Sequence, residues 1–493
     1  MKQIDAARAA ELVEGLAERG MVIGGDRSSA GGAGAYEHHN PTTGAVQATV
    51  PLAGADDVDA AVQAARAALP GWRDMPLPER MAALHRLADL LTARRAEAGA
   101  INALDNGTPI SAMDSGGYAA LFVRYYAGWV DKLEGEVVPV HGGDGFDYVV
   151  PEPYGVVGAI VPWNGPLMGM GQKCGPALAA GNTVVAKPPE IAPFGAIAFA
   201  ELALEAGLPP GVVNVVPGGA VAGEALVRHP GVDKVSFTGG TATARLVMAA
   251  AAETLTPLAL ELGGKSANVI FPDADLDAAV QASAFLGCTL LSGQGCALPT
   301  RLYVHDDVYD EVVERLVAQV EAVTVGDPLD RRTLMGPVVT EAACERILGV
   351  VTRAGAEGAG TLLTGGARLG GDLARGYFVA PTVFGDVDHG SDLARAEIFG
   401  PVLSVLRFAD EDEVVAQVND SEYGLGAYLH TRDVSRALRL AKAFEVGSVT
   451  VNGFPGGSPG APFGGYKQSG FGREGGRAGL EEMVRRKNVY IGL

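Results

Sequence analysis

A single cysteine, Cys296, stands among small residues in the stretch GQGCALPTR at positions 293–301. A carboxylate, Glu261, stands earlier in the chain, within LELGGK at positions 260–265. A cysteine thiolate attacks carbonyl carbon, and a carboxylate can then activate the water molecule that removes the acyl group. These two residue types predict covalent catalysis on a carbonyl compound, provided that the fold brings them together.

Composition limits the partners of the chain. Its 493 residues exceed what one hydrophobic core usually serves, so two or more domains are expected. The net charge of -20 argues against nucleic acid and anionic membranes, and the short basic run at 485–487 is interpreted as a solvated strand. Four cysteines without a CxxC pair favour a reducing cytoplasm, and no run approaches the roughly 18 apolar residues of a membrane span.

Apolar spacing predicts an α/β fold with a doubly wound parallel sheet. Positions 55–98 are helical, with Asp56 or Asp57 as a cap. Short apolar runs, which are typical of strands buried on both faces, then alternate with alanine-rich helices. Strands are predicted at 156–161, 183–186, 212–216 and 234–237, and helices at 194–205, 221–228 and 241–252. A second alternating region spans 269–451, the stretch 453–476 predicts a loop over a site, 136–150 a hairpin, and 488–493 a terminal strand.

Ligands of such sheets bind beyond the carboxyl ends of the strands, where helix N-termini can face phosphate. Those ends carry PWN at 162–164, KPPE at 187–190 and TGG at 238–240. Adjacent histidines on a strand point to opposite faces, so His38 and His39 predict no metal site. A ligand is therefore expected near the three strand ends.

Ten motifs in order give the chain its resemblance. They are LDNG (104–107), PWN (162–164), PALAAGNTVVAKPPE (176–190), GLPPGVVNVVPG (207–218), FTGG (237–240), LELGGKS (260–266), GQGC (293–296), EIFGPV (397–402), YGL (423–425) and PFGGYKQSGFGRE (462–474). Together they resemble the aldehyde dehydrogenase superfamily, the NAD(P)-dependent enzymes that oxidise aldehydes. The resemblance implies a Rossmann-type dinucleotide-binding domain (1–130 and 154–263), an α/β catalytic domain (264–468) and a small β oligomerisation element (131–153 and 480–493).

The resemblance also implies a mechanism. Cys296 is the nucleophile, Glu261 the general base, and the Asn164 side chain forms an oxyanion hole with the backbone N–H of Cys296. Cys174, Cys288 and Cys344 are interpreted as packing residues. Arg477 falls where many relatives place a glutamate near the water channel, so a second proton route is in doubt and Glu261 is the main base.

For the cofactor, the resemblance implies that Lys187 and Glu190 hold the adenosine ribose. A carboxylate accepts hydrogen bonds from a free 2′-hydroxyl but repels a 2′-phosphate, so Glu190 favours NAD over NADP. Gly240 replaces the usual serine at the pyrophosphate, where backbone N–H groups remain, and no GxGxxG fingerprint is present. The other implied cofactor residues are Val161, Pro162, Trp163, Gly223, Phe237, Thr238, Gly239, Leu262, Gly263, Glu397 and Phe399.

Four glycines stand where relatives narrow the substrate tunnel: Gly165, Gly169, Gly295 and Gly457. With Leu291 and Phe463 they predict a wide apolar pocket for a bulky aliphatic, terpenoid or aromatic aldehyde. The alternative is that neighbouring Met168, Met170, Leu291, Phe454 or Phe463 fills the space.

Rival functions stay open at this point. A CoA-acylating semialdehyde dehydrogenase would pass the thioester to CoA, but such enzymes generally lack the base that Glu261 supplies. A catalytically inactive structural or binding relative is disfavoured because Cys296, Glu261 and Asn164 are all present, and a thiol esterase would work without NAD. The resemblance further implies self-association to a homodimer or homotetramer.

Overall fold

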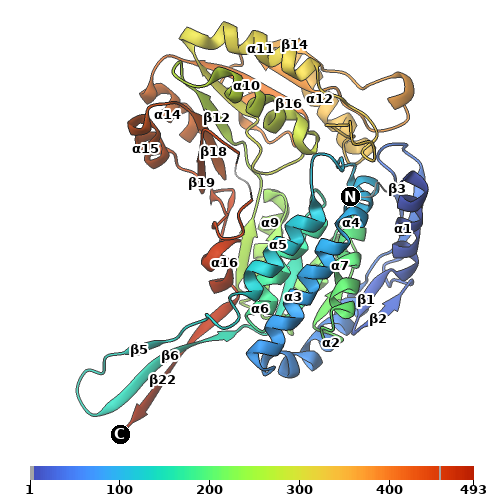
Figure 1. The fold of residues 1–493 in the computed structure, drawn as a ribbon, viewed down its shortest axis with the longest axis vertical. Helices are drawn as coiled ribbons and strands as arrows, with labels where there is room; N and C mark the ends of the chain where they lie inside the picture. Colours follow the sequence, from blue (N-terminus) through green and yellow to red (C-terminus); the bar gives the residue numbers. More distant parts are fainter. Residues whose placement is uncertain (1–4, 455–456) are drawn as a thin grey trace.

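The computed structural model describes residues 5–454 and 457–493. Two α/β lobes lie against each other, and a narrow β arm projects from the first lobe, with the C-terminus at its end (Figure 1). The fold class expected from the sequence is therefore confirmed.

The first lobe is built on an eight-stranded sheet in the order β2-β1-β9-β8-β7-β10-β11-β21. The strands from β9 to β11 are parallel, and along the chain their order is 3-2-1-4-5, that of dinucleotide-binding sheets. The order therefore reverses between β7 and β10. Four strands lie within one residue of the predicted limits: β7 (Val156–Ile160), β8 (Thr183–Lys187), β9 (Val213–Val215) and β10 (Lys234–Thr238). The fifth, β11 (Leu258–Glu261), was not predicted as a strand.

Alternate residues of β7 belong to two different cores, which is why its sequence is apolar throughout. Val157 and Ala159 pack into the core that contains Trp72 and Tyr126, whereas Val156 packs into the opposite core. Helices cover both faces (Figure 1). They are α1 (Ala6–Arg19), α2 (Ala55–Arg73), α3 (Leu77–Ala93), α4 (Arg95–Asn106), α5 (Ser115–Ala127), α6 (Pro166–Ala179), α7 (Phe194–Glu205), α8 (Ala220–Arg228), α9 (Thr241–Ala252) and α16 (Gly476–Glu481).

The prediction that Asp56 or Asp57 caps the first of the covering helices was wrong. The N-cap of α2 is Gly54, so both aspartates lie in the first turn, where the helix dipole favours negative charge. The Asp57 carboxylate accepts the backbone N–H of Gly54 at 2.8 Å and that of Gly32 at 2.7 Å. It thus closes the helix start from inside the first turn.

The second lobe has a seven-stranded sheet in the order β14-β15-β16-β13-β12-β18-β19, parallel except for the antiparallel pair of β14 and β15. Its strands are β12 (Ala267–Ile270), β13 (Arg301–His305), β14 (Thr361–Thr364), β15 (Thr382–Gly385), β16 (Val402–Phe408), β18 (Gly426–His430) and β19 (Ser448–Val451). Its helices are α10 (Leu276–Ala284), α11 (Tyr309–Glu321), α12 (Glu341–Glu357), α13 (Asp392–Arg395), α14 (Glu411–Asn419) and α15 (Val434–Ala443). One helical stretch, Leu276–Gly293, has the length and apolar composition of a membrane span, but 67% of it is buried inside the fold, as in a core helix.

The arm confirms the predicted hairpin and terminal strand. β6 (Gly145–Pro153) pairs antiparallel with β5 (Glu136–Val138) and with β22 (Val484–Gly492). The basic run at 485–487 lies in β22 and is exposed, as predicted. The smaller strands are β1 (Met21–Ile23), β2 (Asp26–Ser28), β3 (Ala35–His39), β4 (Val46–Pro51), β17 (Tyr423–Gly424), β20 (Tyr466–Lys467) and β21 (Gly470–Phe471). The last two lie in the stretch predicted to be a loop, of which 455–456 fall outside the described residues.

Candidate active site

The strand ends at the reversal point carry the residues that were predicted to do chemistry. β7 ends at Ile160 and leads directly into the PWN motif, which closes with Asn164. β10 pairs in parallel with β11 so that Thr238 lies opposite Glu261, the last residue of β11. Because parallel strands end at one edge of a sheet, the oxyanion donor and the base proposed from the sequence lie at the same edge.

Cys296 follows a loop with an uncommon backbone. Leu291 and Ser292 both have φ 53°, in the left-handed region that residues with side chains seldom adopt. The Ser292 hydroxyl donates to the carbonyl oxygens of Gly336 at 2.8 Å and Pro337 at 3.3 Å, which anchors the loop. Cys296 is half-buried, whereas the other three cysteines are fully buried. Access and anchoring suit a nucleophile.

Asn164 connects the two lobes close to Cys296 in the chain. Its side-chain Nδ2 donates to the backbone carbonyl oxygen of Gln294 at 2.7 Å. The Gln294 side chain is held in turn, since its Oε1 accepts the backbone N–H of Val339 at 3.0 Å. An amide group has two N–H donors, so Asn164 keeps a second donor beyond the bond to Gln294.

Glu261 is a buried carboxylate whose two oxygens lack a hydrogen-bond partner within the described part of the chain. Only 4% of the residue is exposed. The Glu261 carboxylate packs against Gly464, where a Cβ would lie 2.8 Å from Glu261 Oε1. Burial, and after it the negative charge of Glu474, raises the pKa of Glu261 to about 9. A carboxyl group raised in this way can take up and release a proton near the working pH of an enzyme.

Glu474 is a second buried carboxylate that the sequence reasoning missed. Lys173 Nζ on α6 donates to Glu474 Oε1 at 2.5 Å and to Ser236 Oγ at 2.9 Å. The charges of Glu474 and Lys173 both act on Glu261, the first raising and the second lowering its pKa. The three groups therefore form one coupled cluster.

The expectation drawn from Arg477 is corrected accordingly. Arg477 is exposed and pairs with Glu481 at 2.8 Å, so it does not mark the position of the missing carboxylate. Two signals in the sequence could have found the cluster. Lys173 is the only charged residue of α6, and Glu474 closes the last of the ten motifs.

The Cys296 thiol is neutral in this resting site. Burial raises the pKa of Cys296 to about 12, and the carboxylates of Glu397, Glu261 and Glu474 add to the effect. The Cys296 carbonyl lies against Gly264, where a Cβ would come within 2.6 Å of the oxygen. Only glycine at that position lets the nucleophile loop pack on the segment that follows Glu261.

Lys187 and Glu190 follow β8 at the predicted ribose position. Lys187 Nζ donates to the Gly218 carbonyl oxygen at 2.8 Å, and burial lowers the pKa of Lys187 to about 8 against the opposing charge of Glu190. A Cβ at Gly219 would lie 3.3 Å from Glu190 Oε1, and one at Gly223 would lie 3.8 Å from Lys187 Cδ. The start of α8 is thus packed on this pair through glycines.

Two helix N-termini at this edge carry no side-chain cap. The N-cap of α8 is Gly219 and that of α9 is Gly240, where a Cβ would meet nothing within 4 Å. At Gly239 a Cβ would lie 2.6 Å from the Phe237 ring, so only glycine fits there. Free backbone N–H groups at helix starts bind phosphate, so these residues fit the pyrophosphate of a dinucleotide.

The residues predicted for the nicotinamide end also come together. Glu397 Oε1 accepts the backbone N–H of Gly264 at 2.9 Å, and a Cβ at Gly263 would lie 2.2 Å from Glu397 Oε2. Phe399, with φ 51°, meets Trp163 edge to face at 5.3 Å between ring centroids. The remaining predicted cofactor residues lie in or directly after β7, β10 and β11: Val161, Pro162, Phe237, Thr238 and Leu262.

The space beside each of the four substrate glycines is already occupied. A Cβ would lie 3.2 Å from Met168 Cε at Gly165, 3.1 Å from Pro162 Cδ at Gly169, 2.8 Å from Leu298 Cγ at Gly295, and 2.7 Å from Tyr118 Cε1 at Gly457. Of these neighbours, only Met168 was among those considered from the sequence. Leu291 packs on a cluster that contains Leu298, and Phe463 pairs its backbone with that of Glu474. The geometry favours the filled alternative over an open pocket.

The two histidines of β3 have different partners. His39 Nδ1 lies 3.2 Å from the Gly44 carbonyl oxygen, whereas His38 Nε2 lies 3.0 Å from Asp105 Oδ1 in a fully buried pair. Among residues 5–454 and 457–493, no group of three or more potential metal ligands exists. The sequence had not indicated the acidic partner of His38.

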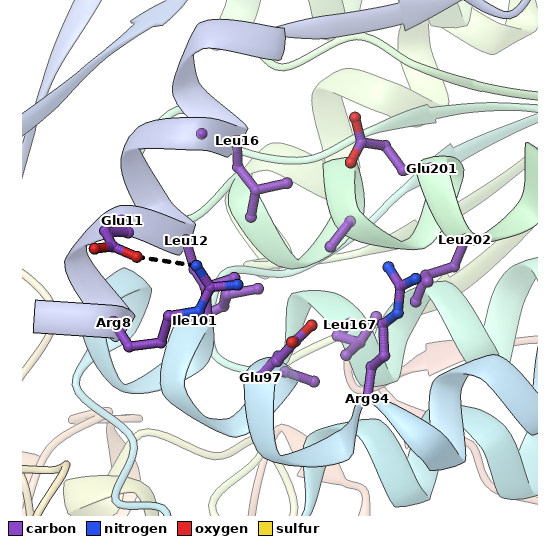
Figure 2. Close-up of a pocket in the computed structure, with 13 residues that line it drawn as sticks. Arg8, Glu11, Leu12, Leu16, Arg94, Glu97, Ile101, Leu167, Glu201 and Leu202 are labelled. Atoms are coloured by element: carbon purple, nitrogen blue, oxygen red, sulfur yellow. Dashed lines mark hydrogen bonds and ion pairs between the residues drawn. The ribbon is translucent and has the colours of Figure 1, made fainter. Parts of the chain in front are cut away.

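A hollow of about 410 Å³ lies elsewhere, between α1, α4, α6 and α7. Figure 2 shows its charged rim, including Arg8, Arg94 and Glu201, around apolar side chains such as Leu202. The catalytic residues proposed above do not line it.

Comparisons with known proteins agree with this geometry. A model described as the aldehyde dehydrogenase family matches residues 28–489. The mitochondrial aldehyde dehydrogenase of Homo sapiens is 46% identical over 459 residues, covering 92% of this chain and 88% of the relative. An aldehyde dehydrogenase of Bacillus cereus in complex with NAD+ has a TM-score of 0.95 with 41% identity over 100% of this chain and 99% of that chain. An NADP-dependent enzyme of E. coli has a TM-score of 0.94 with 37% identity over 100% of both chains. The chain therefore belongs to the aldehyde dehydrogenase family of NAD(P)-dependent oxidoreductases.

Proposed function

We propose that the protein oxidises an apolar aldehyde to its carboxylic acid with NAD, through a thioester on Cys296 that water hydrolyses. The observation that carries the proposal is Glu261: a buried carboxylate without a hydrogen-bond partner among the described residues, whose charge acts on Cys296. A carboxylate kept dry and uncommitted at the nucleophile supports the role of a general base.

In the proposed reaction Glu261 takes the proton of the Cys296 thiol as the sulfur adds to the aldehyde carbon. The free N–H of Asn164 and the backbone N–H of Cys296 hold the developing oxyanion, and one such donor contributes about 3 kcal/mol. NAD, when bound, accepts the hydride that the adduct loses on becoming a thioester. Glu261 releases the thiol proton to solvent and then takes a proton from water as the water attacks the thioester. It passes that proton to the Cys296 sulfur, which leaves as the thiol.

Trapping the thioester tests this assignment. Glu261→Gln keeps the size of the side chain but removes the base, so an acyl adduct should accumulate on Cys296 in the presence of aldehyde and NAD. Mass spectrometry of the intact variant measures it, and Cys296→Ala in the same experiment is the control without adduct. Normal steady-state turnover of Glu261→Gln at pH 7 would contradict the proposal.

A preference for NAD over NADP is proposed from Glu190. Both kinds of enzyme occur among the similar structures, so the family alone does not decide. A carboxylate beside the ribose repels a 2′-phosphate, and Glu190→Gln removes that repulsion. We expect the variant to raise kcat/KM for NADP about tenfold relative to NAD, measured by absorbance. Glu201→Gln, elsewhere in the first lobe, should leave the ratio unchanged.

The side chains that fill the four glycine positions set the width of the proposed substrate. Tyr118, Met168 and Leu298 are apolar or aromatic, which supports an apolar aldehyde. Comparing kcat/KM for acetaldehyde, decanal and cinnamaldehyde tests the bulky class predicted from the sequence. A clear preference for acetaldehyde would overturn that class. The side chains that occupy the space beside the four glycines would then explain the narrow specificity.

The rival functions have their own readouts. CoA should not accelerate turnover, because Glu261 lets water accept the acyl group. NADH formation on aldehyde addition separates the enzyme from an inactive relative. Cytoplasmic location and assembly as a homodimer or homotetramer through the arm stay predictions; sedimentation tests the assembly.

A further inference from the structure

The loop that carries Asn164 is fixed from behind by a side chain outside the proposed catalytic set. Asn106, the last residue of α4, is buried and donates through Nδ2 to the backbone carbonyl oxygen of Trp163 at 2.9 Å. That carbonyl belongs to the peptide unit joining Trp163 to Asn164. Holding it fixes the direction in which the Asn164 side chain leaves the backbone.

Asn106 is itself held on all sides. Its second N–H donates to Asn102 Oδ1 at 3.3 Å, and its own Oδ1 accepts the backbone N–H of Thr108 at 3.2 Å. The chain then turns at Gly107, with φ 82°, against Pro337, whose Cγ would lie 2.8 Å from a Cβ at Gly107. A fully bonded amide in a packed turn has one orientation, so it can set the position of another group.

The far end of the same connection reaches the nucleophile loop. Asn164 donates to the Gln294 carbonyl oxygen, and Ser292 in that loop bonds the carbonyl oxygen of Pro337, which packs on Gly107. The contacts form a closed circuit from α4 through Asn164 and the nucleophile loop back to the end of α4. A shift of about 1 Å in a group that holds a transition state can cost on the order of 100-fold in rate.

We propose that Asn106 is the positioning residue of the oxyanion donor: it aims Asn164 through the Trp163 carbonyl and touches neither substrate nor cofactor. This inference rests on the proposed function, because it assigns Asn106 a role only through Asn164.

Asn106→Asp isolates the bond in question. The carboxylate can still accept the N–H of Thr108, but it has no N–H for the Trp163 carbonyl. We expect kcat to fall about 10-fold to 100-fold with little change in the KM for aldehyde. The same loss should appear in hydrolysis of p-nitrophenyl acetate without NAD, in which Cys296 attacks the ester carbon, nitrophenolate leaves, and water hydrolyses the thioester.

A double-mutant cycle with Asn164→Ala decides between positioning and general damage. In the Asn164→Ala background, Asn106→Asp should cost less than about threefold, because the donor it aims is gone. An equal fold loss in both backgrounds overturns the inference and leaves the proposed function standing. An Asn164→Ala variant that keeps normal activity overturns the oxyanion assignment itself, and the inference with it.

The control is Asn214→Asp, a buried asparagine with the same kind of bonds. Asn214 donates to the carbonyl oxygens of Val184 and Gly211 and accepts the backbone N–H of Gly24. Asn214→Asp should lower thermal stability, and its effect on kcat should be the same in the wild-type and Asn164→Ala backgrounds. If the carboxylate at position 106 prevents folding, Asn106→Ala goes through the same cycle with the same two outcomes.

Discussion

Among the described residues, ionisable side chains lack partners at the proposed catalytic edge of the sheet, whereas they form ion pairs at the hollow between α1, α4, α6 and α7. At the edge, both Glu261 oxygens and Lys265 Nζ are buried without hydrogen-bond partners in the described structure, and burial lowers the pKa of Lys265 to about 7. At the hollow, Arg8 pairs with Glu11 at 2.9 Å, and the side chains are more than half exposed. Other charges that line the hollow are also paired: Arg94 with Glu205 at 2.7 Å, and the largely buried Glu201 with Arg27 at 3.0 Å.

Backbone geometry follows the same division. The left-handed residues Leu291, Ser292 and Phe399 lie by the nucleophile and the proposed cofactor site, whereas α1 and α4 beside the hollow are regular helices. Buried unpaired charge and uncommon backbone cost stability, so a fold keeps them where they serve another purpose. The comparison indicates that buried polar groups without partners, together with uncommon backbone, locate a candidate active site better than the presence of a hollow does.

The largest expected effect comes from removing the buried carboxylate at the proposed catalytic edge. Glu261→Gln should lower kcat on the order of 10² to 10³-fold and yet stabilise the fold at alkaline pH. The folded pKa of Glu261, about 9, lies above its unfolded value, so wild-type stability falls as pH rises toward 9, whereas the variant has no carboxylate to ionise.

Melting temperatures of the wild type and of Glu261→Gln between pH 6 and pH 9.5 measure the predicted gain in stability. The advantage of the variant should grow with pH, to about 1–3 °C. Glu97→Gln at the rim of the hollow is the matched control, with no change in rate. A variant that melts lower than the wild type at pH 9 would show that the Glu261 carboxylate is stabilised by something else.

A smaller effect sharpens the role of the buried cluster. Glu474→Gln removes a negative charge that raises the pKa of Glu261, so Glu261 should ionise at lower pH. Because the base acts in its ionised form, the rise of deacylation rate with pH should move down by about one unit. Single-turnover hydrolysis of the acyl enzyme across pH measures the shift, with the exposed Glu481→Gln as control. If the pH profile of deacylation does not move, the charge of Glu474 does not influence the ionisation of Glu261.

The smallest effect tests the hollow. Gly15 lies inside α1 at its rim, and a Cβ there would meet nothing within 4 Å. Gly15→Ala should stabilise the protein by about 1 kcal/mol through helix propensity, without change in kcat. Gly107→Ala, with φ 82° and Pro337 in the way, should destabilise it instead. Denaturation midpoints measure both; a destabilised Gly15→Ala would mean that the hollow does not admit a methyl group.

Much of this molecule could be predicted from the sequence where one local signal sufficed. The strands at 156–161 and 183–186 are wholly apolar because both faces are buried, and the helix at 194–205 was predicted with the observed limits. The motifs placed Asn164, Glu261 and Cys296 in order along the chain. The parallel sheet then brings Asn164 and Glu261 to one edge, whereas Cys296 comes from a loop of the second lobe, next to the Gln294 that Asn164 bonds.

Long-range pairings could not be predicted in the same way. Glu474 becomes important only because Lys173, 301 positions away, meets it inside the fold. The glycines of the substrate site suggested open space, but the side chains that fill it, such as Tyr118 beside Gly457, come from distant segments. A single sequence gives residue types and spacing; it does not give the packing partner.

The pairing of β21 with β11 has a consequence for synthesis. Ser469 bonds the Gly263 carbonyl oxygen across 206 positions, and Gly470 pairs beside Glu261. A ribosome makes these residues long after Glu261, so β11 can pair with β10 but its other edge, which receives β21, stays unpaired while the intervening chain emerges. Cys296 is thus translated long before β21 can close the site around Glu261, and a nascent chain should carry the cysteine without the completed site.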